Sequence, residues 1–510
     1  MIHRPQHLPW ILATCLIASW SLGAFVPLRA DDPLVKLSFA EIAHDDPQSA
    51  SPELSALATT VVPRTEEQLV DLSTVLQLAQ AQNPSIGLSR QAIQEALALQ
   101  LQARGMMLPT LRAGANYHGH QGIVQTSDGL MRQVTESSLY LGNGAFAVGA
   151  TTMLYPGIQI FAPLGDGVFE PLAARQLLAS RRFQAEATTN QILLDVARRF
   201  LDLVRAEADL RAIRLSETDV NQAVLITDAF AKVKQGRQAD ARRAQATAAL
   251  LHADETQAQE NVLIASAELA RVLSLSPSIR LRIAFPSDAL LEMVDAQRSL
   301  EELLQLAQSA RPELAALGAE IARKQTQVRQ ERVRPLLPTV SLGFSAGTFG
   351  GGTDRTDLVP IHPEFGRFGG RTDVDLIAYW TLENLGAGNL ARVKQRTTER
   401  NLAMLEQERM FNLIRREVAS AQASVRARQK DLGIAGQRLR IAERAFRLDF
   451  SRIKGNLGLP IELLNSLNRL THARRDLPRV VRDYNLAQMQ LFVALGQTPL
   501  AARVASGQAR

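Results

Sequence analysis

The chain has a single cysteine, Cys15, which lies near its amino terminus. The surrounding segment has the pattern of a leader that is removed, so the mature protein is expected to contain no cysteine. Disulfide bonds, a catalytic thiol and a cysteine-ligated metal are therefore excluded for the mature protein.

Long apolar runs, a dominant charge and many aromatic residues are also missing. Beyond the leader, no stretch reaches the roughly 18 apolar residues of a transmembrane helix. Basic and acidic residues are interspersed, at a formal net charge of +6, which argues against a nucleic-acid-binding surface. Aromatic residues make up 5% of the chain. That is sparse for a membrane β-barrel, whose two interfaces usually carry aromatic girdles.

Residue types that carry chemistry do not converge in the sequence. The 8 histidines are scattered, and the one close pair, His118 and His120, has no cysteine beside it. Gly350–Gly352 is not followed by Lys-Ser/Thr, so it is not a phosphate-binding loop. We therefore expect no catalytic residue, no cofactor and no metal site, and we predict that the protein is not an enzyme.

The amino-terminal segment has the features of a secretory signal peptide. Arg4 precedes a mostly apolar stretch that ends in Leu28-Arg29-Ala30, and two aspartates follow. We predict that residues 1–30 are a signal peptide cleaved near Ala30; a retained membrane anchor and lipidation at Cys15 are the alternatives. Residues 31–68 are acidic, contain proline and serine and lack periodicity, which predicts a flexible linker.

The strongest pattern in the chain is an internal repeat. Leu76-Gln77-Leu78-Ala79-Gln80 returns unchanged as Leu304-Gln305-Leu306-Ala307-Gln308, and Asn83-Pro84 corresponds to Arg311-Pro312. Solenoid units have periods of roughly 20–50 residues, so this much longer repeat indicates a duplicated half-molecule. We place the first repeat at residues 69–278, the second at 299–499 and a carboxy-terminal tail at 500–510.

Each repeat opens with two helical patterns. Short helices are predicted at Leu72–Gln82 and Leu300–Ala310. Proline then opens a second helix at Pro84 and at Pro312, because proline at the first helical position gives up an N–H that has no partner there.

Each repeat closes with a helical hairpin. Very long helices are predicted over about Pro171–Gln235 and Gly386–Lys454, each roughly 100 Å long at 1.5 Å per residue. We expect glycine to end both, and return helices to follow at Gln238–Ser274 and Pro460–Gly496. Pro478 is expected to kink the last helix by removing a hydrogen bond. Apolar residues at coiled-coil steps form the predicted seams: Ile192, Val196, Phe200, Leu203, Leu210 and Ile213, and then Leu467, Leu470, Leu477, Val481, Tyr484, Leu491 and Leu495.

Between the second and third helices of each repeat, the apolar period changes to two. Strands are predicted at about 110–118 and 144–155 in the first repeat, and at about 338–347 and 372–382 in the second. Alternation over about ten residues with one apolar face is typical of a transmembrane β-strand. The polar segments His118–Gly142 and Gly347–Arg371 are predicted as loops outside the membrane.

Four strands cannot form a stable barrel by themselves. An open sheet in lipid leaves edge N–H and C=O groups without partners, at several kcal/mol each, and small bacterial barrels use about eight strands. We therefore expect several copies of the chain to pool their strands around a symmetry axis.

Three local patterns mark the passages between these elements. Pro109-Thr110 and Pro338-Thr339 enter the strands, Trp380-Thr381-Leu382-Glu383-Asn384-Leu385-Gly386 leaves them, and the hairpin tips are Phe230–Ala241 and Phe450–Leu464. Together with the duplication, from about Leu69 to Pro499, these patterns resemble the TolC family of outer-membrane efflux proteins.

The resemblance implies a mainly α fold with a small transmembrane β part. Its expected form is a long α-helical coiled-coil tunnel plus four β-strands per chain, closing as a trimeric 12-stranded barrel in outer-membrane lipid with a long periplasmic part. It also implies a passive exit duct of a tripartite efflux or type I secretion system. The expected partners are a periplasmic adaptor protein and an inner-membrane transporter, with no nucleic acid and no cofactor.

The resemblance also implies roles for residues at the hairpin tips. Glu462, Asn465 and Asp240 fall where family members close the periplasmic mouth. The adaptor-docking turns correspond to Gly236 in the first tip and to Gly455, Leu457, Gly458 and Leu459 in the second.

Two alternatives remain open at this point. Three copies of Glu462 near an axis would form an acidic ring that attracts cations, or Glu462 only starts its helix, where an acid suits the helix dipole. For the whole chain, the alternative is a periplasmic coiled-coil scaffold that does not enter a membrane. The exported cargo is not indicated.

Overall fold

The computed structural model describes residues 67–108, 110–112, 115–125, 131–141, 158–233, 237–295, 297–350, 368–455 and 457–501. The predicted signal peptide at 1–30, most of the predicted linker and most of the carboxy-terminal tail lie outside these residues. The linker prediction is wrong at its end: Glu67 and Gln68 belong to strand β1 (Glu67–Val70), which pairs in parallel with β6 (Arg280–Ile283).

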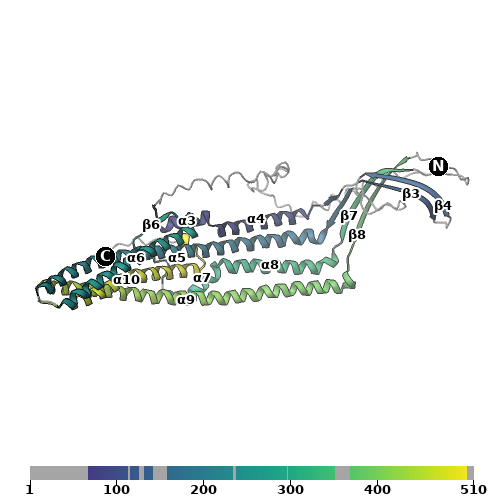
Figure 1. Cartoon of the computed structure of the whole chain (residues 1–510). Helices are drawn as coiled ribbons and strands as arrows, with labels where there is room; N and C mark the ends of the chain where they lie inside the picture. Colours follow the sequence, from purple (N-terminus) through teal and green to yellow (C-terminus); the bar gives the residue numbers. More distant parts are fainter. Residues whose placement is uncertain are drawn as a thin grey trace. The chain divides into compact units, whose positions relative to one another are not determined.

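The helices of the two repeats match in order and in length. α3 (Leu72–Gln82) and α7 (Leu300–Ala310) have 11 residues each, and α4 (Pro84–Gly105) and α8 (Pro312–Val333) have 22 each. α5 (Leu164–Lys232) and α9 (Ala387–Lys454) have 69 and 68. α6 (Gln238–Val272) and α10 (Pro460–Ala494) have 35 each. The predicted helix order is confirmed, and Figure 1 shows the two sets along the chain.

Side chains at the helix starts explain why these boundaries could be predicted. Asp71 accepts a hydrogen bond from the N–H of Thr74 before α3, and Ser299 accepts one from Glu302 before α7. Each satisfies a donor that the first turn leaves without an intrahelical partner. Pro84 and Pro312 occupy the first positions of α4 and α8, as expected.

The start of the first long helix differs from the prediction. α5 begins at Leu164, so Pro171 lies inside the helix and does not open it. The ring of a proline crowds the carbonyl four residues earlier, which here belongs to Gly167. Gly167 is buried, and a Cβ at this position would lie 3.2 Å from the backbone oxygen of Met106. α10 likewise continues through Pro478 to Ala494.

The larger sheet has six described strands that lie along four lines. β7 (Thr339–Gly350) pairs on one side with β8 (Phe368–Tyr379). On its other side it pairs first with β5 (Ile158–Pro163) and then with β4 (Met131–Leu141). β2 (Thr110–Arg112) pairs with β5, and β3 (Ala115–Gln125) pairs with β4. The four lines are therefore β2/β3, β4/β5, β7 and β8.

The first-repeat strands differ from their predicted positions. His118–Gly142 was expected to be a loop, but β3 and β4 form an antiparallel pair there, with Gln125 opposite Met131. The predicted strand at 144–155 lies outside the described residues. Leu141 and Ile158 pair with Ala346 and Phe344, which are only two positions apart on β7. The second-repeat strands also begin or end a few residues beyond the predicted 338–347 and 372–382.

The two long helices organise the packing of the others. α5 contacts α4, α8, α6 and α10, and α9 contacts α8, α7 and α10. Near its start, α5 meets α8, where Gln330 donates hydrogen bonds to Asp166 and Glu170. Farther along, α5 meets α10, where Arg475 donates to Asp209. The long helices α5 and α9 thus belong to two groups of four helices. With α4 and α8 they form the group nearer the large sheet, and with α6 and α10 they form the far set (Figure 1).

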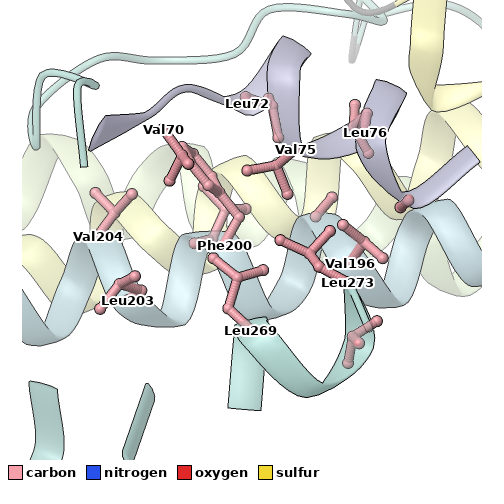
Figure 2. Packing of buried hydrophobic residues seen from close by; sticks show 14 of the residues in the cluster. Val70, Leu72, Val75, Leu76, Val196, Phe200, Leu203, Val204, Leu269 and Leu273 are labelled. Atoms are coloured by element: carbon pink, nitrogen blue, oxygen red, sulfur yellow. The ribbon is translucent and has the colours of Figure 1, made fainter. Parts of the chain in front are cut away.

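Three clusters of buried apolar residues hold these helices together. In the first, Val75 and Leu76 of α3 pack on Phe200 of α5 and Leu269 of α6, as Figure 2 shows. The second repeats this arrangement with Leu303 of α7, Val418 of α9 and Leu491 of α10. Most residues of the two predicted seams are buried, including Val196, Phe200, Leu203, Ile213, Leu467, Leu470, Val481, Tyr484, Leu491 and Leu495. Among the described helices, none combines the length and apolar character of a membrane span.

Candidate functional site at the helical hairpin tips

The two long helices end in the same backbone geometry at the hairpin tips. The cap of α5 is Val233, at φ −89° and ψ 9°, and the cap of α9 is Gly455, at φ −85° and ψ 9°. Both conformations are open to any residue, and a Cβ on Gly455 would have no neighbour closer than 3.5 Å. The expectation that glycine ends both helices is therefore confirmed for α9, although the geometry at Gly455 does not require glycine, and it is wrong for α5, which ends at Lys232. Gly236 lies outside the described residues.

Of the two tip glycines that the structure describes, packing requires glycine at Gly458. A Cβ there would lie 3.1 Å from Cγ1 of Ile453 and 3.2 Å from its backbone nitrogen. The turn is closed by a hydrogen bond of 2.8 Å from the N–H of Leu457 to the carbonyl of Arg452. Ile453 is fully buried, so the turn is pressed against the end of the apolar core.

A buried cluster supports both tips from within. It combines Val220 and Ala223 of α5 with Ala244 of α6, Ile453 of α9 and Leu463 of α10. Because all four helices contribute, the two tips are held at the same end of the helical layer. The apolar residues beyond this cluster point outward: Leu457 is 77% exposed and Leu459 is 61% exposed.

Glu462 occupies the third position of α10 and has partners within its own chain. Its carboxylate accepts a hydrogen bond of 3.3 Å from the backbone N–H of Leu459. This contact satisfies one of the donors that the helix start leaves free. The Glu462 carboxylate also lies 4.0 Å from the guanidinium of Arg452, and its side chain remains 42% exposed. Within one chain, then, Glu462 does act at the start of its helix.

Asp240 lies at the third position of α6, which corresponds to Glu462 because α6 and α10 have equal lengths. Unlike Glu462, it is buried. Its carboxylate accepts a hydrogen bond of 3.0 Å from Arg243, one turn later. Asn465 is exposed, one turn into α10. The structure thus presents Glu462 and Asn465 on the surface of α10 and covers Asp240.

Sequence reasoning missed Arg452 and Ile453 in this site. Arg452 supplies the carbonyl that closes the turn and the charge nearest to Glu462. Ile453 forms the surface on which Gly458 packs. The available signal was Ile453 itself, an apolar residue in the last turn of α9, four positions before Leu457-Gly458. An apolar residue at this place often packs on the residues that follow the helix end.

One group of metal-ligating residue types comes together elsewhere in the described part of the chain. Glu217 of α5 and His252 and Glu255 of α6 each place a ligand atom within 4.8 Å of the others. No metal site was expected from the sequence, where Glu217 lies 35 residues before His252.

Comparison with known proteins finds a family model that matches the second repeat. Residues 303–497 match the family model described as outer membrane efflux protein. No curated protein matches the chain in sequence.

Solved structures show the same fold at low sequence identity. The outer membrane protein VceC from Vibrio cholerae is 18% identical, with 84% of this chain and 96% of that chain covered and a TM-score of 0.63. The CmeC outer membrane channel of Campylobacter jejuni is 13% identical, with 86% and 87% covered and a TM-score of 0.64. The MtrE outer membrane channel of Neisseria gonorrhoeae, solved in an open state, is 18% identical, with 84% and 89% covered and a TM-score of 0.63.

The sequence match and the fold match overlap along the chain. The second repeat carries the sequence match, and the fold match extends over most of the chain. The resemblance to the TolC family of outer-membrane efflux proteins is therefore confirmed.

Proposed function

We propose that the chain forms a trimeric outer-membrane channel that acts as the passive exit duct of a tripartite efflux or type I secretion system. The observation that carries the proposal is the large sheet, which has an open edge on each side within the described residues. β8 pairs only with β7 there, and β3 pairs only with β4. Such edges in lipid need further strands to satisfy their backbone groups.

The exposed face of β8 supports insertion of this sheet in a membrane. Val374 and Leu376 alternate along the strand and are 66% and 64% exposed. Trp380 follows the strand and donates a hydrogen bond of 3.2 Å from its indole N–H to the carbonyl of Leu336. A tryptophan with an apolar ring and a bonded N–H suits the boundary between lipid and water.

Four lines of strands per chain set the expected number of copies. Three chains would supply a ring of about twelve strands with an open lumen, whereas two would supply about eight, a barrel that side chains fill. A passive duct needs the open lumen, so we propose three copies.

The outer helices carry apolar residues that a neighbouring copy would cover. The helices of the far set lie in the order α6, α5, α10 and α9. α6 and α9 are therefore its two outer helices. Their exposed large apolar residues include Leu250, Leu263 and Ile264 on α6 and Leu402, Leu405, Ile434, Ile441 and Leu448 on α9. Repeated exposure of large apolar side chains on helices marks an interaction surface. Contact between α6 of one copy and α9 of the next would close the ring.

The hairpin tips are the proposed docking surface for a periplasmic adaptor. Leu457 and Leu459 are exposed at a turn that Gly458 holds against the core. Gly236 and Gly455 complete the two proposed docking turns. An inner-membrane transporter would join through the adaptor and supply the energy, so transport needs no catalytic residue in this chain.

Glu462 and Asn465 are the proposed lining of the periplasmic gate. Both lie on the exposed side of the first two turns of α10. Three copies of Glu462 around an axis would attract cations and repel one another. Asp240 is the weaker gate candidate, because it is buried and bonded to Arg243.

The first experiment is a native mass measurement on the mature protein. The protein would be extracted with detergent from washed envelopes and its mass determined with the detergent subtracted. Three copies that resist extraction without detergent would support the channel. A monomer or dimer released by washing alone would contradict it and would favour the periplasmic scaffold.

A further inference from the structure

Glu217, His252 and Glu255 bring together three metal-ligating side chains from two helices. Glu217 lies on α5, whereas His252 and Glu255 lie one turn apart on α6. One ligand atom from each residue lies within 4.8 Å of the other two. We propose that these residues bind a divalent transition-metal ion, of which Zn²⁺ is the probe, and that the ion joins the two arms of the first hairpin.

The spacing of the donors fits such an ion. Zinc binds histidine nitrogen and carboxylate oxygen at about 2.0–2.2 Å in tetrahedral geometry, which separates neighbouring ligand atoms by roughly 3.3–3.6 Å. Nδ1 of His252 lies 3.2 Å from Oε1 of Glu217. A small rotation of Glu255 would bring its oxygen to a similar separation. Three protein ligands would leave a fourth position for water.

The charges of the cluster also favour a cation. Arg214 donates a hydrogen bond of 2.8 Å to Oε1 of Glu255, and Gln259 donates one of 3.0 Å to the same oxygen. The bond from Arg214 is the largest cause that lowers the pKa of Glu255, so this carboxylate is ionised at neutral pH. Its second oxygen has no part in those two bonds. The cluster thus brings two acidic side chains together with one arginine, an excess of acidic groups that suits a divalent cation.

The exposure of the ligands allows an ion to enter. The side chains of Glu217 and Glu255 are 24% and 15% exposed, and that of His252 is 75% exposed. The carboxylates are therefore partly shielded from water, which strengthens their attraction for a cation. The imidazole can approach from solvent as the third ligand.

The second repeat lacks this arrangement at the corresponding positions. α6 and α10 have equal lengths, so His252 and Glu255 correspond to Arg474 and Leu477. Counting back equally from Lys232 and Lys454, Glu217 corresponds to Leu439. The site would thus belong to the first hairpin alone, about 22 Å from the end of α5 at 1.5 Å per residue. The inference does not depend on the proposed channel function.

The test is zinc binding to the detergent-extracted full chain, prepared without a histidine tag and stripped with EDTA. Equilibrium dialysis against buffered free Zn²⁺ would count bound ions per chain in the wild type, in His252→Ala and in Glu217→Gln. His472→Ala is the matched control, because His472 is also an exposed histidine on a return helix. We expect both cluster variants to lose one ion per chain, or to bind it at least tenfold more weakly, and the control to keep it.

A structural readout separates this site from other histidines. Zn²⁺ should slow backbone hydrogen exchange around residues 214–218 and 251–256 in the wild type and in His472→Ala, but not in His252→Ala. Equal zinc binding by the wild type and His252→Ala would overturn the proposal. So would the absence of any bound zinc in a correctly folded wild type, because His252 and Glu217 would then form an ion pair only.

Discussion

The two hairpins of this chain have the same lengths but different surroundings. α6 and α10 both have 35 residues, yet α10 packs against both α9 and α5, whereas α6 packs mainly against α5. Consequently α10 is buried along much of its length, and α6 keeps large apolar residues exposed. Local sequence therefore sets the extent of each helix, and position in the fold sets how much of its surface must be apolar.

The same comparison applies where the return helices end. In the first repeat, the side-chain N–H₂ of Asn83 donates a hydrogen bond of 2.9 Å to the carbonyl of Val272, the last residue of α6. In the second repeat, Nε of Arg311 donates one of 2.7 Å to the carbonyl of Ala494, the last residue of α10. Arg311 also contacts Glu313 at 3.1 Å and Glu417 at 2.6 Å. The same kind of helix-end contact thus occurs in both repeats, and in the second it is part of a charged network.

The largest effect is expected from Arg311→Ala. The arginine side chain is 8% exposed, and its loss leaves two carboxylates and a helix-end carbonyl without their partner. Removal of one member of a buried ion pair costs about 3–5 kcal/mol. We expect about 3 kcal/mol of lost unfolding free energy, because both glutamates can reach solvent in part. Denaturant unfolding of the detergent-extracted protein measures it.

Two matched variants sharpen this prediction. Arg311→Asn installs the residue of the first repeat and should recover part of the loss by restoring the bond to Ala494. Asn83→Ala removes a neutral hydrogen bond and should cost about 1 kcal/mol. Equal losses for Asn83→Ala and Arg311→Ala would contradict the view that the second repeat depends on the charged network.

The next effect concerns the residues just after the return helices. Ser274 and Gly496 occupy corresponding positions with φ of 60° and 82°. A Cβ on Gly496 would lie 2.5 Å from the backbone oxygen of Ala310. Gly496→Ala should therefore cost at least about 2 kcal/mol, from left-handed strain of about 1–2 kcal/mol plus the overlap. Ser274→Gly should raise the unfolding midpoint. A stable Gly496→Ala protein would show that this junction can shift.

A smaller effect should distinguish the two glycines of the second tip. Gly458→Ala places a Cβ 3.1 Å from Ile453, and such overpacking costs about 1–3 kcal/mol. Gly455→Ala meets no close atom and should be neutral, or stabilising by about 0.4–1 kcal/mol. Thermal unfolding of the two variants, measured side by side, gives the comparison. A greater loss for Gly455→Ala would contradict the assignment of the tight contact to Gly458.

The smallest effect on stability, but a diagnostic one, is expected at Glu462. Glu462→Ala removes both the negative charge and the acceptor for the N–H of Leu459, whereas Glu462→Gln removes only the charge. If three copies form the gate, both variants should raise the conductance of the closed channel in planar bilayers. If Glu462 acts only at its helix start, neither should change conductance, and Glu462→Ala alone should lose about 1 kcal/mol of stability.

The helices could be predicted closely from the sequence for local reasons. The N–H groups at the starts of α3 and α7 are satisfied by the side chains of Asp71 and Ser299. At the starts of α4 and α8, Pro84 and Pro312 remove an N–H that would lack a partner. These four boundaries therefore depend on residues close by in the sequence. α5 was the exception. Its first turns at Leu164–Glu170 lie beside α8, where Asp166 and Glu170 accept hydrogen bonds from Gln330. That tertiary contact extends the helix past a proline that usually marks a helix start.

The strands of the first repeat were predicted less well. Alternation predicts that a segment is extended but does not say which partner it pairs with. β3 and β4 contain polar residues such as His118, Gln121 and Glu136, which led to the prediction of a loop. Their pairing with each other, and the pairing of β4 with β7, place these polar residues in a ladder that no local pattern revealed.

The sequence by itself determined the repeat, the helix order and the resemblance to a family, because caps, periodicity and repeated motifs act over a few residues. The tertiary structure alone decided that Gly458 is the constrained tip glycine, that Asp240 is covered while Glu462 is exposed, and that Glu217 meets His252 and Glu255. The Gly458 contact depends on how the turn folds back on the end of α9. The other two depend on which faces of separate helices come into contact, and the pairing of helices is set by packing over the whole layer.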